Sequence, residues 1–170
     1  ENQPSISKTP YLSEEAIQSD LSIVLEGETG VGKTSLAKKI HKRSNRVGSL
    51  VHLNLSAFSP NLLESELFGH VKGAYTGATF EKKGALLEAN DGTLFLDEID
   101  SISWDIQTKL LLFLDSKEVR PVGGSSTKKT SARIIFATGE SLFSLVRQGK
   151  FRKDLYFRIN SGLHLYLPSL

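Results

Sequence analysis

The sequence contains no cysteine and no methionine, few aromatic residues and no long hydrophobic run. Without cysteine, a disulfide or a thiolate metal site is excluded. The longest apolar run covers residues 110–114, and five residues are too few to span a membrane. The four histidines are scattered without metal-ligand spacing, so we expect them to be structural or surface residues. The absence of methionine even at residue 1 favours a piece of a longer chain.

The composition is that of one ordinary globular domain. The chain has 170 residues, of which 39% are hydrophobic and 24% charged, enough to bury a core. A net charge of +2 is too small to argue for nucleic-acid binding by the bulk of the domain. We interpret the basic cluster of Lys128 and Lys129, with Arg133 nearby, as a solvated loop. Residues 1–20 are predicted to be a lead-in arm, with a short helix capped by Ser13, before one α/β unit over residues 21–170.

Short apolar runs alternate with helical patterns along the chain. This alternation predicts a mainly parallel five-stranded sheet covered by helices on both faces. The predicted strands cover residues 22–26, 51–55, 93–97, 133–138 and 162–167. The predicted helices cover residues 33–44, 61–68, 84–89, 105–116 and 141–148. Two glycines at residues 123 and 124 predict a small hairpin inserted before the fourth strand.

A glycine-rich segment at residues 27–34 fits the phosphate-loop pattern G-x-x-x-x-G-K-[ST] at every fixed position. Because it follows a predicted strand and opens a predicted helix, its backbone N–H groups would face a phosphate. We expect Lys33 to reach the β- and γ-phosphates and the Thr34 hydroxyl to bind Mg²⁺. The alternative is a glycine-rich turn that binds nothing. The expected nucleotide-binding residues are Gly27, Glu28, Thr29, Gly30, Val31, Gly32, Lys33, Thr34 and Ser35.

The third predicted strand ends in two carboxylates, Asp97 and Glu98. In a parallel sheet this end lies at the carboxyl edge, beside the phosphate loop, where ligands bind. Asp97 is expected to hold Mg²⁺ and Glu98 to orient and polarise an attacking water. Acidic pairs after strands are also common as structural residues, which is the alternative. Their place relative to the phosphate loop favours a hydrolase.

The least common feature is the hexapeptide Gly-Ala-Tyr-Thr-Gly-Ala at residues 73–78. Its glycines disfavour both helix and strand, which predicts a loop with Tyr75 at its tip. It follows Glu-Ser-Glu-Leu-Phe-Gly-His at residues 64–70. With the phosphate loop and the acidic strand end, this stretch closely resembles the central AAA+ ATPase domain of sigma-54-dependent transcriptional activators. The resemblance covers residues 21–168.

The resemblance implies a three-layer P-loop NTPase fold that binds ATP and Mg²⁺ and hydrolyses ATP. It implies that the loop contacts sigma-54 RNA polymerase and remodels its closed promoter complex. It also implies a ring of copies of the chain, usually a hexamer, in the bacterial cytoplasm, with DNA bound by a separate domain. The helical lid of the family is expected to be absent from these 170 residues.

The resemblance also assigns roles to single residues. Arg152 and Arg158 match the pair of arginine fingers that act on a neighbouring subunit, although arginines in a charged helix are otherwise solvated or salt-bridged. Asn54 matches a polar partner that restrains Glu98, with a strand-capping asparagine as the alternative. Thr138 matches a nucleotide sensor. The expected partner-binding residues are Gly73, Ala74, Tyr75, Thr76, Gly77 and Ala78.

The chain departs from the family pattern at several positions. Tyr75 replaces the usual phenylalanine and keeps its apolar ring. Gly139 stands where the family has an asparagine near the γ-phosphate, so of that sensor pair only Thr138 remains. The residues before the phosphate loop do not match the family's usual segment, so the adenine pocket is not assigned.

Two other functions fit parts of the sequence. One is a regulatory module that binds nucleotide and hydrolyses it poorly, as the glycine at residue 139 suggests. The other is a relative with the same fold and a different partner, either a DNA-binding repressor or a general AAA+ remodeller. The intact hexapeptide argues against a different partner, since such a protein would have no use for it.

Overall fold

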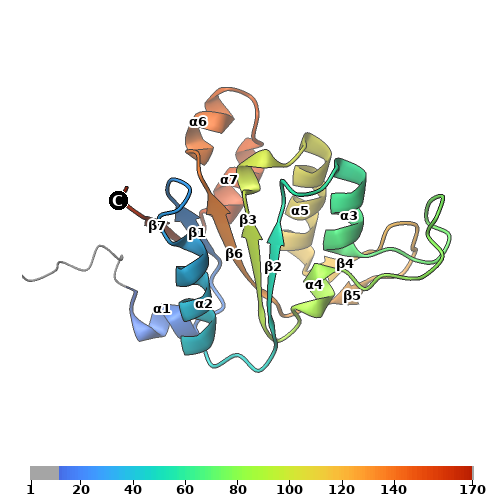
Figure 1. Ribbon diagram of the computed structural model, residues 1–170, viewed down its shortest axis with the longest axis horizontal. Coiled ribbons are helices and arrows are strands. Elements are labelled where there is room, and N and C mark those ends of the chain that lie inside the picture. The colour runs from blue at the N-terminus through green and yellow to red at the C-terminus, as the bar shows by residue number, and fades with distance from the viewer. Residues whose placement is uncertain (1–11, 170) are drawn as a thin grey trace, which may run out of the picture.

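The computed structural model describes residues 12–169, which form a twisted parallel sheet between layers of helices (Figure 1). The strand order is β2-β3-β6-β1-β7, and every neighbouring pair is parallel. All five predicted strands are confirmed, each within one residue of its predicted bounds. The observed strands are β1 Ile23–Glu26, β2 Leu50–Asn54, β3 Thr93–Asp97, β6 Arg133–Thr138 and β7 Leu163–Tyr166. Their parallel alignment brings all carboxyl ends to the same edge.

The five predicted helices are also present, with ends shifted by one residue. They are α2 Lys33–Arg43, α3 Pro60–Phe68, α4 Ala85–Glu88, α5 Trp104–Ser116 and α6 Leu142–Arg147. The predicted short helix is α1 Glu14–Gln18, which begins where the Ser13 hydroxyl accepts a hydrogen bond from the Ala16 N–H (3.1 Å). A 3₁₀ turn, η1 Ile99–Ser101, and the helix α7 Lys153–Ile159 complete the helical elements of the described residues. None of the helices in residues 12–169 is long and apolar enough to cross a membrane.

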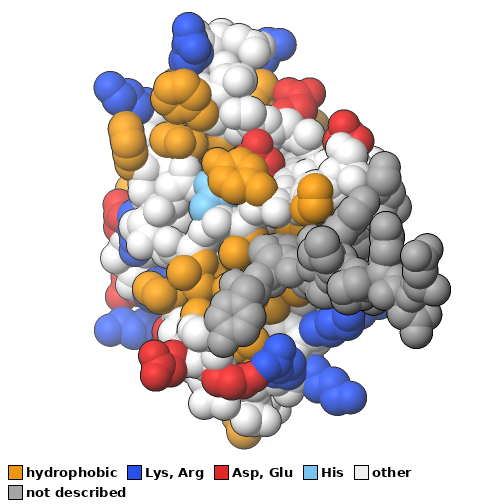
Figure 2. Space-filling model, turned by 90° about the vertical axis from the view of Figure 1, so that its left-hand side faces the viewer, with side chains coloured by type: hydrophobic (Ala, Val, Ile, Leu, Met, Phe, Trp, Pro, Cys, Tyr) orange, Lys and Arg blue, Asp and Glu red, His pale blue; other side chains and the backbone are white. Residues whose placement is uncertain are grey.

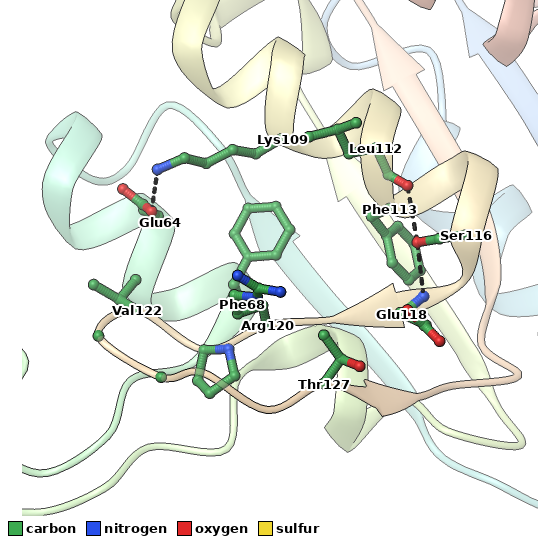
Figure 3. A pocket seen from close by; sticks show the side chains of 13 residues that line it. Glu64, Phe68, Lys109, Leu112, Phe113, Ser116, Glu118, Arg120, Val122 and Thr127 are labelled. Carbon is green, nitrogen blue, oxygen red and sulfur yellow. Dashed lines mark hydrogen bonds and ion pairs between the residues drawn. The ribbon is translucent and has the colours of Figure 1, made fainter.

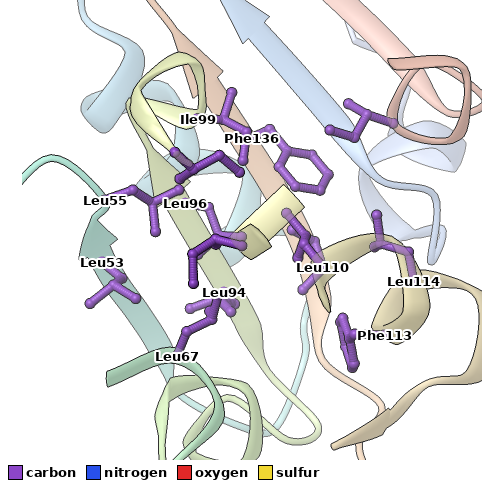
Figure 4. Close-up of a cluster of buried hydrophobic side chains, with 14 of the residues drawn as sticks. Leu53, Leu55, Leu67, Leu94, Leu96, Ile99, Leu110, Phe113, Leu114 and Phe136 are labelled. Atoms are coloured by element: carbon purple, nitrogen blue, oxygen red, sulfur yellow. The ribbon is translucent and has the colours of Figure 1, made fainter. Parts of the chain in front are cut away.

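The core lies on both faces of the sheet because successive strand residues point to opposite sides. On one face, Leu94 and Leu96 of β3 join Phe136 of β6 in a large apolar cluster under helices α3 to α7 (Figure 4). On the other face, Phe95 and Ile135 pack in a smaller cluster with side chains of α2. Since β3 and β6 are apolar on both faces and fully covered, they hold the residues at their ends in fixed positions.

The predicted hairpin is present, although its turn is longer than two residues. Strand β4 (Glu118–Val119) pairs antiparallel with β5 (Lys128–Lys129). The connecting residues 120–127 contain a turn in which the Gly124 N–H donates to the Pro121 carbonyl (2.9 Å). Lys128 and Lys129 are exposed, as expected.

The expectation that Arg133 belongs to a solvated basic loop is wrong. Arg133 is the first residue of β6 and only 2% exposed. Its guanidinium donates to three backbone carbonyls at the end of α1 and just after it, those of Ala16 (2.8 Å), Ile17 and Leu21 (2.9 Å). Burial lowers the pKa of Arg133 to about 10, which leaves it protonated at neutral pH. Residues 1–11 of the arm expected over residues 1–20 lie outside the described residues. Arg133 joins the described part of the arm to β6.

The substitution Arg133→Met is expected to destabilise the domain by roughly 2–4 kcal/mol. It removes charge-assisted hydrogen bonds and leaves buried carbonyls without a donor. The measurement is the midpoint of urea unfolding, at an unchanged slope. Lys129→Met is the matched control, because Lys129 is exposed and a surface substitution shifts stability by only about 0.5 kcal/mol. Equal midpoints for the two variants would show that Arg133 does not hold α1.

Candidate functional site

The phosphate loop connects β1 to α2 and has the backbone that its glycines allow. Gly30 and Gly32 have φ values of 88° and 98°, and a Cβ added to either would meet no atom within 4 Å. The glycines are therefore required by backbone conformation and not by crowding. The Lys33 ammonium donates to the carbonyl oxygens of Gly27 and Glu28, the latter at 3.2 Å. It lies across the loop that is predicted to hold phosphates.

The acidic strand end lies next to this loop, as the strand order requires. A cleft of about 500 Å³ opens between them. It is lined by Thr29, Gly30, Gly32, Lys33, Thr34, Ser35, Asp97, Glu98, Asp100, Gly139 and Glu140. The structure thus brings together the predicted lysine, the predicted Mg²⁺ ligands Thr34 and Asp97, and the predicted base Glu98. Among the residues that line the cleft, four are acidic and one is basic, a formal balance of −3 (one minus four).

Glu98 has an unusual backbone conformation for a residue with a side chain. Its φ and ψ are 58° and 48°, in the left-handed region, directly before the η1 turn. For a residue other than glycine, this conformation costs roughly 1–2 kcal/mol. Its N–H donates to Oδ1 of Asp97 (2.9 Å), and its carbonyl accepts from the Ser101 N–H (3.0 Å) and hydroxyl (2.8 Å). The surroundings hold Glu98 in this place despite the strain.

Two side chains of β2 lie near these carboxylates. Asn54 is aligned with Asp97, but its amide oxygen accepts from the Ser56 N–H (3.0 Å) and hydroxyl (2.9 Å). In residues 12–169 it makes no hydrogen bond to Glu98, so its predicted restraining role stays a prediction. His52, which the sequence offered only as one of four scattered histidines, lies 3.6 Å from Oδ2 of Asp97 with its ring on Phe95. Only the β2–β3 register brings it there.

The end of β6 closes the cleft on the other side. The Gly27 N–H donates to the Thr138 carbonyl (3.1 Å), which joins the phosphate loop to the predicted sensor. The Thr138 side chain hydrogen-bonds to Asp100 (3.1 Å) and to the Glu140 backbone. Sequence reasoning missed Asp100 and Glu140. Asp100 follows the acidic pair by two residues, but nothing in the sequence shows that the turn folds back to β6.

The two predicted fingers lie outside the cleft, on and beside α7. Arg152 makes a bidentate pair with Asp154 (3.0 and 2.8 Å), donates to the Thr108 hydroxyl (2.8 Å) and lies 5.4 Å above the Trp104 ring. Hydrogen bonding to Asp154 raises the pKa of Arg152. Arg158 donates to Asp115 (3.1 Å) and to the Leu114 carbonyl (2.8 Å). Neither arginine lines the cleft of its own chain.

The hexapeptide forms the far end of a loop that leaves α3 and returns to α4. Gly73 and Gly77 have φ values of 82° and 90°, and the Gly73 N–H donates to the Ala78 carbonyl (2.9 Å). Tyr75 is 44% exposed, and its ring meets the His70 ring edge-on, with the two ring centroids 5.0 Å apart. The base of this loop is held by His70, whose ring bonds the Ser65 hydroxyl and the Phe80 carbonyl (2.8 Å).

The two legs of the loop cross at a pair of glycines. A Cβ added to Gly69 would lie 2.4 Å from the Lys82 carbonyl oxygen, and one added to Gly84 would lie 2.4 Å from the Gly69 nitrogen. Beyond the crossing, His70 and Lys82 exchange two backbone hydrogen bonds (2.9 and 2.8 Å). The loop therefore leaves the domain through a crossing that only glycine permits.

The hairpin is bonded to the same loop. The Val122 N–H donates to the Gly69 carbonyl (2.9 Å), and the Val71 N–H donates to the Val122 carbonyl (3.1 Å). Behind the hairpin lies a hollow of about 560 Å³, between the Phe68 and Phe113 rings and beneath the Lys109–Glu64 ion pair (Figure 3). The segment 121–124 thus separates this hollow from the hexapeptide loop.

The face that carries β7, α1 and α2 bears hydrophobic side chains between scattered charges (Figure 2). At this edge, the His164 ring stacks on Tyr166 at 4.4 Å and bonds Glu26 (2.8 Å) just before the phosphate loop. In residues 12–169, no three histidine or acidic side chains gather in a way that could hold a metal ion alone.

Gly69→Ala is expected to destabilise the domain far more than Gly73→Ala, although both glycines have a φ of 82°. Gly73 has open space for a Cβ, so alanine there adds only backbone strain, about 1–2 kcal/mol. At Gly69 the steric overlap with Lys82 adds to that strain, for a total of about 3 kcal/mol or more. Thermal unfolding of both variants measures the difference, and equal losses would mean that the crossing is not tight.

Comparison with known proteins shows the family. The chain matches the sigma-54 interaction domain over residues 1–164. It is 49% identical over 142 residues to the probable regulatory protein WtsA of a pathogenicity locus in Pantoea stewartii, covering 84% of this chain and 44% of that protein. It is 45% identical to the probable regulatory protein HrpS of Pseudomonas savastanoi, over 94% of this chain and 52% of that protein. The regulatory protein AtoC of Escherichia coli is 45% identical, over 89% of this chain and 33% of its own length. The chain thus spans about a third to a half of these relatives.

Solved structures agree on the fold. NtrX of Brucella abortus in complex with ATP superposes with a TM-score of 0.83 and 34% identity, over 92% of this chain and 35% of that one. The P-loop NTPase domain of a sigma-54 activator from E. coli, 16% identical with a TM-score of 0.55, shows the fold alone. The three-layer P-loop NTPase fold is confirmed. With the family match over most of its length, the chain belongs to the sigma-54 interaction domain family of transcriptional regulators.

Proposed function

We propose that this chain binds and hydrolyses ATP and uses the energy to remodel sigma-54 RNA polymerase through the loop at residues 73–78. The observation that carries the proposal is the meeting of the phosphate loop and the acidic strand end in one cleft. ATP bound in the related NtrX structure supports a nucleotide as the ligand. The exposed Tyr75, held on a loop with a rigid base, supports a contact with a protein partner.

In the proposed mechanism, the lysine and the loop amides bind the phosphates. When ATP binds, the Lys33 ammonium exchanges its hydrogen bonds to the Gly27 and Glu28 carbonyls for contacts with the β- and γ-phosphates. Glu98 accepts a proton from the attacking water, since its strained backbone holds the carboxylate at the cleft. Thr138 senses the nucleotide from the end of β6, and Asn54 restrains Glu98.

The residues of the cleft fit a magnesium ion. Thr34 and Asp97 are hard oxygen donors that both line it, and Mg²⁺ is usually held by one or two protein groups together with phosphate and water. Bound Mg²⁺ would neutralise phosphate charge and polarise the phosphoryl group. Such a cation would also offset the repulsion between the four carboxylates of the cleft and a polyphosphate.

The net negative charge of the cleft side chains also supports assembly into a ring, because a neighbouring copy could supply the missing positive charge. Arg152, directly before α7, and Arg158 on α7 lie outside the cleft of their own chain, which supports a role in the cleft of a neighbouring copy. An arginine from another subunit would add positive charge where negative charge develops in the transition state, worth about 10³–10⁵ in rate. To act there, Arg152 exchanges its pair with Asp154 for the phosphate. DNA would be bound by a separate domain of the same protein.

Replacing Glu98 with glutamine is expected to leave ATP binding intact and to lower turnover by about 10²–10⁴, because the amide cannot accept the proton. Phosphate release measures turnover, and a fluorescent ATP analogue measures binding, in the full-length protein. Glu88→Gln is the matched control, since Glu88 is exposed on α4 and does not line the cleft. Turnover of Glu98→Gln within twofold of the unmodified protein would contradict the assignment of the base.

Tyr75→Ala is expected to leave ATP turnover within about twofold and to abolish open-complex formation at a sigma-54 promoter, since the variant loses the exposed ring but not the cleft. Tyr75→Phe is the matched control because it keeps the ring and its contact with His70. Permanganate reactivity of the promoter reports the open complex. Normal activation by Tyr75→Ala would disprove the loop assignment, while loss of turnover would place Tyr75 in the ATPase.

A further inference from the structure

The glycine at residue 139 is not required by the fold. Its φ lies outside the left-handed region, and an added Cβ would find its nearest atom, the Gly27 carbonyl oxygen, at 3.9 Å. A Cβ at this position would therefore meet no steric obstacle. Packing therefore does not explain why the cleft has no polar side chain at residue 139. A neighbouring side chain can supply part of what a polar residue there would do.

Asp100 lies at this part of the cleft. It lines the cleft beside Gly139 and Glu140, and its Oδ1 lies 3.1 Å from the Thr138 hydroxyl. The single hydroxyl proton is shared between Asp100 and the Glu140 carbonyl (2.7 Å), and the hydroxyl oxygen accepts from the Glu140 N–H (3.1 Å). Because a carboxylate cannot donate a hydrogen bond to a phosphate oxygen, Asp100 does not replace an amide by direct contact. Its effect passes through the groups that it holds.

Those groups include the turn that begins at Glu98. The backbone of Glu98 is in the left-handed region, and its own hydrogen bonds go to Asp97, the last residue of β3, and to Ser101 of the turn. Within that turn, the Ile99 side chain is fully buried and anchors the turn to the core. Asp100 supplies the polar bond that ties the turn to β6. The two attachments, one apolar and one polar, together fix the orientation of the turn.

We propose that Asp100 is a positioning residue for hydrolysis, which by its bond to Thr138 fixes the η1 turn and so sets the Glu98 carboxylate against the phosphate loop. The proposal rests on the proposed function, in which Glu98 is the base. The same bond would couple the predicted sensor to the predicted base. A change in the hydrogen bonding of the Thr138 hydroxyl would reach Glu98 through Asp100 and the turn that follows Glu98.

The test compares Asp100→Ala with Asp100→Asn in the full-length protein. Alanine removes the acceptor, and kcat is expected to fall about tenfold, equivalent to about 1.4 kcal/mol, while the dissociation constant for ATP stays within about twofold. Asparagine keeps Oδ1 as an acceptor and is expected to recover most of the rate. Asp105→Asn is the matched control, because Asp105 is exposed at the start of α5 and lines no part of the cleft.

A double substitution tests the route through Thr138. If Asp100 acts by that bond, Asp100→Ala combined with Thr138→Val is expected to be no slower than Thr138→Val alone, because the bond is already lost. If the rate loss of the double variant equals the product of the losses of the two single variants, the proposal is overturned. So would an Asp100→Ala rate within twofold of the unmodified protein, or a loss of ATP binding that asparagine does not restore.

Glu98→Gln in the same assay separates the two hypotheses. If the unmodified protein turns over ATP and Glu98→Gln does not, the proposed function stands and the Asp100 variants alone decide this inference. If the unmodified protein shows no turnover, or if Glu98→Gln keeps it, the proposed function fails first and the role of Asp100 falls with it.

Discussion

The parallel alignment of the central strands is the constraint on which the rest of the structure depends. It places the ends of β1, β3 and β6 at one edge of the sheet. The hydrogen bond from the Gly27 N–H to the Thr138 carbonyl then continues the β1–β6 ladder into the phosphate loop. The loop, the acidic strand end and Thr138, the predicted sensor, thus share one rigid frame. Side chains distant in the sequence become parts of one cleft because backbone hydrogen bonds fix the strands in register.

The strands and most helices could be predicted because the local signals agree with the global fold. Residues 93–97 are apolar on both faces, as a buried parallel strand must be, and end in acids at the expected edge. The phosphate loop was predictable for the same reason, since its glycines, lysine and threonine serve backbone geometry and phosphate chemistry at fixed spacing.

The other contacts depend on tertiary register, which local patterns do not encode. Arg133 stands near two exposed lysines in the sequence, yet as the first residue of β6 its guanidinium is buried against the backbone carbonyls of α1. Asp100 was one acid among several until the η1 turn brought it to Thr138. His52 lies near Asp97 only because β2 and β3 pair in a particular register. In each case the position of the backbone, and not the residue type, decides the role.

The glycine crossing at the base of the hexapeptide loop has a mechanical consequence. With no side chains between the legs, the backbones of Gly69 and Gly84 touch directly, and the His70–Lys82 and Val122 hydrogen bonds tie the legs to the hairpin. The legs cannot slide past each other without breaking this contact. Because these contacts join backbone to backbone, a displacement of the C-terminal end of α3 would move the hexapeptide loop and the hairpin together.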